Sequence, residues 1–271
     1  MIHAAALAAT GQRGDYTLLD VPPSLLAAAV NQIRSGALHG MNATIPHKGA
    51  VASLCDRLVG AAETLGVANT LTLAPDGALE GHNTDVAGLE HAIHEAFPTG
   101  PFKGRPVAVI GAGGAGYASV LAAARLNPSN IRVTNRTLSR AITLQEHLSD
   151  AVGCQLKVVD SIVEAVEGAA LVIQATSSGM STAERSPAWL GLMQGVSRYL
   201  QRTAPDACVI DLVYRPGLTP WVAAANVNQR RAANGLSMLV HQAAQAFEIW
   251  TGQLPPSAPL REAALAALRA G

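Results

Sequence analysis

PVAVIGAGGAG, residues 106–116, is a short apolar run that leads directly into a glycine-rich turn. The run predicts a buried strand, and residues 114–126 predict a helix. Gly111, Gly113 and Gly116 have the G-x-G-x-x-G spacing that binds a dinucleotide when a strand precedes it and a helix follows it. The glycines permit the tight turn, the approach of a pyrophosphate and the close packing of helix on strand. The alternative interpretation is a glycine turn that serves packing alone. The predicted strand before the motif and the predicted helix after it favour the dinucleotide site.

The residues after the next predicted strand, Ile131–Thr134, indicate which dinucleotide binds. An NAD site usually carries an acid there, which accepts a hydrogen bond from the ribose 2′-hydroxyl. Here Asn135, Arg136 and Thr137 occupy the position, and Arg140 follows one turn later. Two guanidiniums suit a 2′-phosphate, so the sequence predicts NADP as the cofactor. The alternative is that Arg136 and Arg140 form a solvated helix face.

Strand-like and helix-like segments alternate on both sides of this motif, which favours parallel sheets covered by helices. A Pro/Gly-rich break, residues 98–104, separates two such groups, so we expect two α/β domains with a cleft between them. The further strands expected are Tyr16–Val21, Met41–Ile45, Asn69–Leu73, Ala78–His82, Ala170–Ala175 and Cys208–Val213. The further helices expected are residues 2–10, 24–34 with Ser24 as cap, a helix from His47 or Lys48, 85–96, 138–150, 238–250 and 259–269.

Composition excludes several classes of function. The formal net charge is zero and no basic stripe is visible, which argues against nucleic acid and anionic membranes as partners. Cys55, Cys154 and Cys208 are scattered, so the sequence predicts no metal site and no disulfide framework. The sequence shows no signal peptide and no apolar run long enough to span a membrane, so we expect a cytoplasmic protein.

Polar residues gather where predicted strands end. Lys48 follows a strand and opens a helix, a position suited to a general acid or base, although a lysine there is more often a surface charge. Asn69 begins one hairpin strand and Asp85 follows its partner, so amide and carboxylate groups suited to a hydroxyl-rich ligand share an edge. Asp85 could instead cap the following helix. Gln242 and Gln245 share one helix face.

Taken together, these segments resemble the shikimate dehydrogenase family. The matching segments, in the family's order, are NATIPHK (42–48), GVANT (66–70), GHNTD (81–85), VIGAGGAG (109–116), NRTLSR (135–140), ATSSGM (175–180), DLVYRPGLTP (211–220) and GLSMLVHQAAQAFEIWTG (235–252). The resemblance implies an N-terminal substrate-binding domain, residues 1–86 plus 239–271, and a Rossmann-type NADP-binding domain, residues 87–238. It implies reversible NADPH-dependent reduction of 3-dehydroshikimate to shikimate, in chorismate and aromatic amino acid biosynthesis, by a monomer or homodimer.

The resemblance also assigns roles to single residues. Lys48 and Asp85 would be the catalytic pair. The substrate would be bound by Thr44, Asn69, Asp85, Tyr214 and Gln242. The cofactor would be bound by Gly111, Ala112, Gly113, Gly114, Ala115, Asn135, Arg136, Thr137, Arg140, Thr176, Val213, Gly235 and Met238.

The sequence departs from the family at two places. The family begins with a strand and a Ser-x-Ser-Pro loop whose serines bind the substrate carboxylate, whereas MIHAAALAATG resembles the helix that follows them. We therefore expect a start codon upstream, which intact-mass measurement of the native protein would test. Residues 193–205 resemble an insertion.

Three rival functions remain open. The first is a quinate/shikimate dehydrogenase that prefers NAD; an acid at position 135 or 136 would favour it, and neither position carries one. A non-catalytic NADP-binding paralogue would not need Lys48 and Asp85. The third, a methylene-tetrahydrofolate dehydrogenase, fits the NRT-x-x-R and NTD segments poorly.

Overall fold

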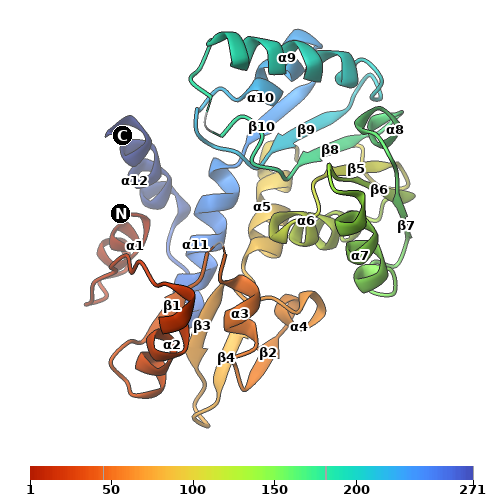
Figure 1. Cartoon of the computed structure of the whole chain (residues 1–271). Coiled ribbons are helices and arrows are strands. Elements are labelled where there is room, and N and C mark those ends of the chain that lie inside the picture. Colours follow the sequence, from red (N-terminus) through yellow and green to blue (C-terminus); the bar gives the residue numbers. More distant parts are fainter. Residues whose placement is uncertain (45, 181, 271) are drawn as a thin grey trace. The chain divides into compact units, whose positions relative to one another are not determined.

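A computed structural model describes residues 1–44, 46–180 and 182–270 of the chain, with the side chain of Ala270 excepted. Ile45, the end of one predicted strand and part of NATIPHK, lies outside the described residues. Contacts divide the chain into a first unit, residues 1–88 with 239–271, and a second unit, residues 89–238 (Figure 1). Both units combine helices and strands, and the predicted α/β class is confirmed.

The second unit contains a six-stranded parallel sheet in the order β10-β9-β8-β5-β6-β7. This order is that of a doubly wound dinucleotide-binding fold, in which the order of the strands reverses between the first and the fourth strand. Those two strands are β5 and β8, which pair along their whole length. The strands are β5 (Val107–Ile110), β6 (Asn130–Thr134), β7 (Gln155–Val158), β8 (Leu171–Gln174), β9 (Cys208–Asp211) and β10 (Arg231–Asn234).

Helices cover this sheet. Every residue of β5, β8 and β9 is buried, as expected of central strands covered on both faces. One core cluster joins these strands to α8, α9 and α10, while α6 and α7 contact β5, β6 and β7. The helices are α6 (Gly114–Ala124), α7 (Leu138–Leu148), α8 (Ile162–Val166), α9 (Pro187–Leu200) and α10 (Pro220–Val227). The predicted insertion, residues 193–205, falls in the end of α9 and the turn after it.

The first unit contains a four-stranded sheet in the order β1-β3-β4-β2. Its strands are β1 (Gly40–Asn42), β2 (Arg57–Val59), β3 (Thr70–Leu73) and β4 (Leu79–His82). The predicted hairpin is confirmed, because β3 pairs antiparallel with β4. The general expectation of parallel sheets holds here only for β2 and β4, since β3 is also antiparallel to β1. The reason for the hairpin is the short turn around Pro75-Asp76-Gly77, which joins β3 to β4 and reverses the chain.

Helices also surround the sheet of the first unit. They are α1 (Ile2–Thr10), the short 3-10 helix η1 (Pro23–Leu25), α2 (Leu26–Arg34), α3 (Lys48–Ala52), α4 (Ala61–Leu65) and α12 (Ser257–Ala270). Two further helices, α5 (Asp85–Ala96) and α11 (Leu236–Thr251), contribute residues to both units. No helix among the described residues is long and apolar enough to cross a membrane.

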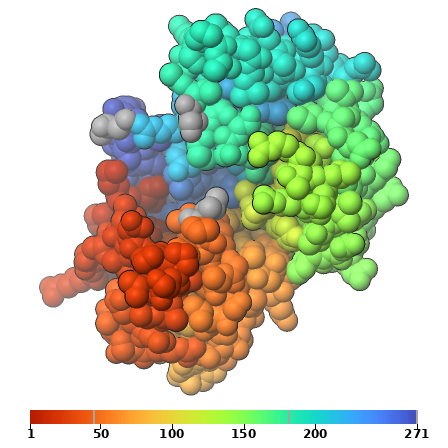
Figure 2. Space-filling model, in the orientation of Figure 1, coloured from red at the N-terminus to blue at the C-terminus, as the bar shows by residue number. Residues whose placement is uncertain are grey.

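Two local predictions in the first unit are wrong. Residues 16–21 form no strand, and Leu18 is 91% exposed. Figure 2 shows this red part of the chain at the surface. A strand requires a neighbouring strand to satisfy its backbone, and no described strand pairs with this segment, whatever its side-chain pattern. Ser24 does not cap a helix, because it lies within η1 and α2 begins at Leu26.

Gly116 offers a test of the packing in the second unit. A Cβ atom at this position would lie 2.2 Å from the Gly111 carbonyl oxygen, so α6 approaches the turn too closely for any side chain. We expect Gly116→Ala to lower the free energy of unfolding by about 3 kcal/mol, since backbone has to move. Gly191→Ala is the control, because a Cβ there meets open space and alanine is the better helix former. Equal urea midpoints for the two variants would contradict this close approach.

Candidate functional site

The ammonium of Lys48 and the carboxylate of Asp85 meet in the first unit. Lys48 is the first residue of α3 and Asp85 the first residue of α5. Lys48 Nζ lies 2.5 Å from Asp85 Oδ2, and the two side chains are 23% and 9% exposed. The structure therefore brings together two predicted site residues that are 37 positions apart. A partly shielded pair of this kind can hold and transfer a proton.

The end of β4 holds the Asp85 carboxylate in place. The side chain of Asn83 accepts a hydrogen bond from the backbone N–H of Asp85, at 3.1 Å. This bond closes a local turn just ahead of α5. Asn69, which immediately precedes β3, is 3% exposed, and its Nδ2 donates to Asp85 Oδ1 at 3.0 Å. The loop after β4 and the residue before β3 therefore fix the carboxylate together.

The other residues predicted to bind substrate lie in different surroundings. Thr44 follows β1 and is exposed, and its carbonyl accepts from the His47 N–H. Gln242 is half-buried on α11, close to α5, since a Cβ on Gly88 would lie 2.8 Å from the Gln242 Cβ. The Gln242 amide donates to the Leu239 carbonyl, and Gln245 is half-buried. Tyr214 is half-buried in the second unit.

The glycine turn after β5 has room for a ligand. Gly111 has φ +118°, a conformation that favours glycine. A Cβ on Gly113 or Gly114 would meet no atom within 4 Å, so the N-terminus of α6 is open at this point. Free backbone N–H groups at a helix N-terminus attract phosphate, so the turn fits the pyrophosphate of a dinucleotide. Ala115 lies in the first turn of the same helix.

The residues after β6 are of two kinds. Asn135 is engaged within the protein: its Oδ1 accepts from the Ala112 N–H at 3.2 Å, and its Nδ2 donates to the Thr137 carbonyl at 2.8 Å. It therefore ties the glycine turn to the start of α7. Arg136 and Arg140 are exposed, and neither guanidinium bonds to another residue that the structure describes. Such cations fit the 2′-phosphate of NADP.

The remaining predicted cofactor residues, except Met238, follow or adjoin the ends of strands in the same sheet. Thr176 follows β8, and its methyl group would lie 2.9 Å from a Cβ on Gly111. Gly235 follows β10 and donates to the Val213 carbonyl, at 3.2 Å. A Cβ on Gly235 would lie 2.1 Å from the Leu212 carbonyl oxygen, so packing alone already requires a glycine at this position. Met238 is half-buried on α11.

Asp211 is a buried residue that sequence reasoning missed. It ends β9 with 0% exposure, and Oδ1 accepts from the Val213 N–H at 3.0 Å. Oδ2 is unpartnered among the residues that the structure describes. Burial raises the pKa of Asp211 to about 7, although Thr219 and the Val213 N–H act to lower it. The D-L-V-Y segment was the available signal, since an acid between apolar residues at a strand end is seldom an ordinary core residue.

The raised pKa of Asp211 predicts a pH-dependent stability. The unfolded carboxyl loses its proton near pH 4, whereas the folded one keeps it to about pH 7. The free energy of unfolding is therefore highest, as far as Asp211 is concerned, below pH 4. It falls as the pH rises from 4 to 7, because the unfolded chain releases the proton that the folded chain keeps. Between pH 5 and pH 8 we expect wild type to lose about 2–3 kcal/mol more unfolding free energy than Asp211→Asn. Urea titrations at both pH values measure this difference, and parallel losses would exclude it.

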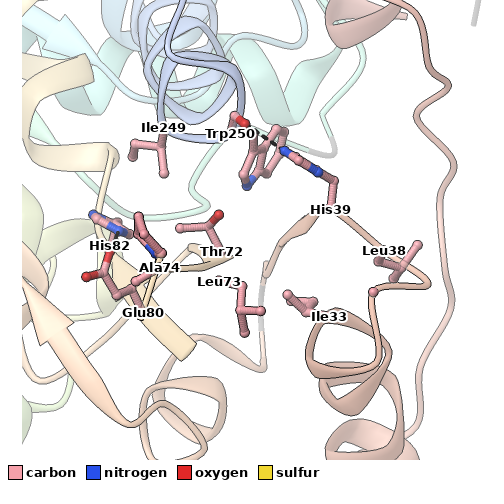
Figure 3. A pocket seen from close by; sticks show the side chains of 12 residues that line it. Ile33, Leu38, His39, Thr72, Leu73, Ala74, Glu80, His82, Ile249 and Trp250 are labelled. Carbon is pink, nitrogen blue, oxygen red and sulfur yellow. Dashed lines mark hydrogen bonds and ion pairs between the residues drawn. The ribbon is translucent and has the colours of Figure 1, made fainter. Parts of the chain in front are cut away.

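A separate pocket of about 540 Å³ lies in the first unit, lined by side chains of α2, β3, β4 and α11 (Figure 3). Trp250 and Ile249 line it from α11, and His82 and Glu80 from β4. His39 Nε2 donates to the Trp250 carbonyl, at 2.8 Å. None of the residues predicted for the site lines this pocket.

Three family models match the chain. Residues 1–71 match the shikimate dehydrogenase substrate binding domain. Residues 93–189 match shikimate / quinate 5-dehydrogenase, and residues 235–265 match the shikimate 5'-dehydrogenase C-terminal domain. The matched segments follow one another along the chain and include both the Lys48 segment and the glycine turn.

Individual relatives agree with these models. The chain is 38% identical over 265 residues to a shikimate dehydrogenase (NADP(+)) of Rubrobacter xylanophilus, which covers 97% of this chain and 89% of the relative. The shikimate 5-dehydrogenase of Thermus thermophilus, solved with NADP(H) and shikimate, is 32% identical with a TM-score of 0.81, over 98% of this chain and 93% of that one. The quinate dehydrogenase of Corynebacterium glutamicum, solved with NAD, is 30% identical with a TM-score of 0.85, over 98% and 93%.

Proposed function

The chain belongs to the shikimate dehydrogenase family, and from that premise we propose that it is an NADP-dependent shikimate dehydrogenase, which interconverts 3-dehydroshikimate and shikimate. The observation that carries this proposal is the contact between Lys48 Nζ and Asp85 Oδ2, at 2.5 Å. A protein that only bound a dinucleotide would have no need of a shielded ammonium–carboxylate pair. We therefore favour the enzyme over a non-catalytic paralogue.

The chemistry requires a proton acceptor and a hydride acceptor. In the direction of oxidation, the secondary alcohol of shikimate loses its hydroxyl proton and a hydride from the same carbon, which becomes a carbonyl. We assign this proton to Lys48, which accepts it as the neutral amine and returns it as the ammonium in the direction of reduction. Asp85 would orient the substrate hydroxyl and the Lys48 side chain. Bound NADP supplies the hydride acceptor, while the protein supplies position and electrostatics. Thr44, Asn69, Gln242 and Tyr214 are our candidates for contacts with the substrate.

The second unit offers the groups that would hold the cofactor. The open glycine turn, with Ala112 and Ala115, would bind the pyrophosphate through backbone N–H groups. Arg136 and Arg140, with Asn135 and Thr137, would bind the adenosine 2′-phosphate. The residues that would face the nicotinamide half are Thr176, Val213, Gly235 and Met238.

A quinate dehydrogenase that uses NAD is the second candidate, because such an enzyme has a TM-score of 0.85 to this chain. The exposed arginines after β6 argue against it, since the cofactor position carries no acid. We expect the enzyme to act in the cytoplasm as a monomer or a homodimer, on its small-molecule substrate and without nucleic acid or membrane.

The test is an assay of the purified chain with shikimate or quinate and with NADP or NAD. Formation of reduced nicotinamide is followed by its absorbance. We expect kcat/KM to be highest for shikimate with NADP. Preference for quinate with NAD would establish the second candidate, and no turnover in any combination would favour the non-catalytic paralogue.

A further inference from the structure

A line of hydrogen bonds in the first unit runs from the surface segment before α2 to Asp85. Tyr16 donates its hydroxyl proton to Asn42 Oδ1, at 3.2 Å. Asn42 Nδ2 donates to Thr70 Oγ1, and Thr70 Oγ1 donates to Asn69 Oδ1, both at 3.0 Å. Asn69 Nδ2 then donates to Asp85 Oδ1. Each group in the line is a donor to the next, and the last acceptor is the carboxylate that contacts Lys48.

Backbone groups fix the direction of the line at Asn42. The Nδ2 atom of Asn42 also donates to the backbone carbonyl of Asn69, at 3.1 Å. A carbonyl can only accept, so the identity of this nitrogen is determined. Since Asn42 donates to the Thr70 hydroxyl, the proton of that hydroxyl points to its other partner, Asn69. Thr70 is therefore an acceptor from one side and a donor to the other.

The same reasoning fixes the amide of Asn69. Its Oδ1 accepts from the backbone N–H of Thr84, at 2.9 Å, as well as from the Thr70 hydroxyl. Its Nδ2 is thereby turned towards Asp85 and the Thr84 hydroxyl. Asn69, Thr70 and Thr84 are 3%, 0% and 2% exposed, so bulk water cannot replace a lost partner without cost.

We propose that Thr70 is a positioning residue for the catalytic pair: its hydroxyl holds the Asn69 amide in the orientation that donates to Asp85. The inference rests on the proposed function, because it assumes that Lys48 and Asp85 act on the substrate. Thr70 itself does not contact Asp85. It acts through Asn69, whose two polar atoms are both engaged within the protein.

The loss of this hydroxyl has a defined consequence. Valine at position 70 leaves Asn42 Nδ2 without one acceptor and Asn69 Oδ1 without one donor. The Asn69 amide keeps the N–H and the hydroxyl of Thr84 as donors to its Oδ1, but with one donor fewer it is held less firmly in the orientation that donates to Asp85. The bond from Asn69, which favours the charged form of the carboxylate, and the contact with Lys48 then become less well oriented.

The substitution changes no titratable group. Lys48 contacts Asp85, and the elements that adjoin this pair carry His47 at the start of α3, Glu80 and His82 on β4, and His241 on α11. Glu80 is itself paired with His82 and Arg57. Thr70→Val neither adds nor removes a charge, so a change in pH dependence would report the orientation of Asn69.

The experiment compares Thr70→Val, Thr70→Ser and Thr72→Val in the full chain. Thr72 lies two residues along β3 and takes no part in the line, so Thr72→Val is the matched control. We expect Thr70→Val to lower kcat for shikimate about five- to tenfold, with little change in KM. Its acid limb of kcat should move about half a pH unit upwards. Thr70→Ser should restore both values, and Thr72→Val should match wild type.

A second readout does not depend on turnover. Carbon-13 NMR of labelled aspartate carboxyl groups, with Asp85→Asn for assignment, follows the titration of Asp85 directly. We expect its midpoint to move upwards in Thr70→Val and not in Thr70→Ser. An unmoved midpoint together with an unmoved acid limb in Thr70→Val would overturn the proposal. If Thr70→Val does not fold, a serine variant that folds but differs from wild type in both readouts would also overturn it.

The two proposals fail in different ways. A moved midpoint in a protein without turnover on shikimate would contradict the proposed function and support the role of Thr70. Normal turnover of wild type on shikimate, with no effect of Thr70→Val on either readout, would support the proposed function and contradict the role of Thr70.

Discussion

Replacement of Lys48 by alanine is expected to lower kcat for shikimate oxidation by about two to four decades, the usual loss on removal of a general acid or base. The ammonium is the proton-transferring group nearest to Asp85 in the described structure, with Nζ 2.5 Å from Oδ2. Asn69 donates to the same carboxylate, and Thr84 bonds to Asn69. Neither side chain can accept a proton at neutral pH. Of the side chains whose bonds to Asp85 the structure describes, only that of Lys48 can carry the proton.

The measurement is single-turnover and steady-state kinetics with saturating shikimate and NADP. Removal of Lys48 also leaves the shielded Asp85 carboxylate without its cation, so unfolding by urea is measured on the same sample. Lys157→Ala is the control, because Lys157 is exposed, pairs with Glu164 at 3.4 Å and lies in the other unit from Lys48 and Asp85. Turnover of Lys48→Ala within a factor of about three of wild type would remove Lys48 from the mechanism.

The second unit could be predicted well because its signals are local. PVAVI forms β5, the glycine turn follows it, and α6 begins at Gly114, all as the sequence predicts. Buried parallel strands are continuous apolar runs, which are easy to recognise. The strands β7 and β10 were missed because they lie at the two edges of the sheet and form no continuous buried run: β7 has one buried residue and β10 has none.

The first unit was harder to predict because its structure depends on pairing partners. Residues 16–21 have a strand-like composition, yet only a neighbouring strand can make a strand of them. The strand β2, only three residues long, was missed because its pairing with β4 is set by tertiary structure. Local sequence carries little information about either case.

The site shows the same division. The sequence identified Lys48 and Asp85 as candidates, because chemistry-bearing residues at strand ends are conspicuous. It did not show that the Asn69 amide is engaged by Asp85 and Thr84, nor that Asn42 and Thr70 lie behind it. Those contacts join β1, β3 and the loop after β4, and they exist only once the hairpin has formed and β1 has paired with β3.

Replacement of Arg136 by glutamine is expected to raise the KM for NADP about 10- to 100-fold, because a charge-assisted hydrogen bond contributes about 1.5–3 kcal/mol. Arg136 is exposed beside the end of β6 and has no partner among the described residues, so its guanidinium is available to an anion. The KM for shikimate should change less than threefold. Because NAD lacks the 2′-phosphate, kcat/KM with NAD should stay near its wild-type value, and the preference for NADP over NAD should fall by the full factor.

Arg198→Gln is the matched control for this prediction, since Arg198 is an exposed arginine of α9 in the same unit and its loss changes the net charge equally. A general weakening of the attraction for a polyanionic cofactor would affect both variants alike and would decline with added salt. A specific contact with the 2′-phosphate would affect Arg136→Gln alone and would leave NAD untouched. If the KM values for NADP and shikimate rose together in Arg136→Gln, the assignment of Arg136 to the 2′-phosphate would be wrong, and Arg140 would become the first candidate for that contact.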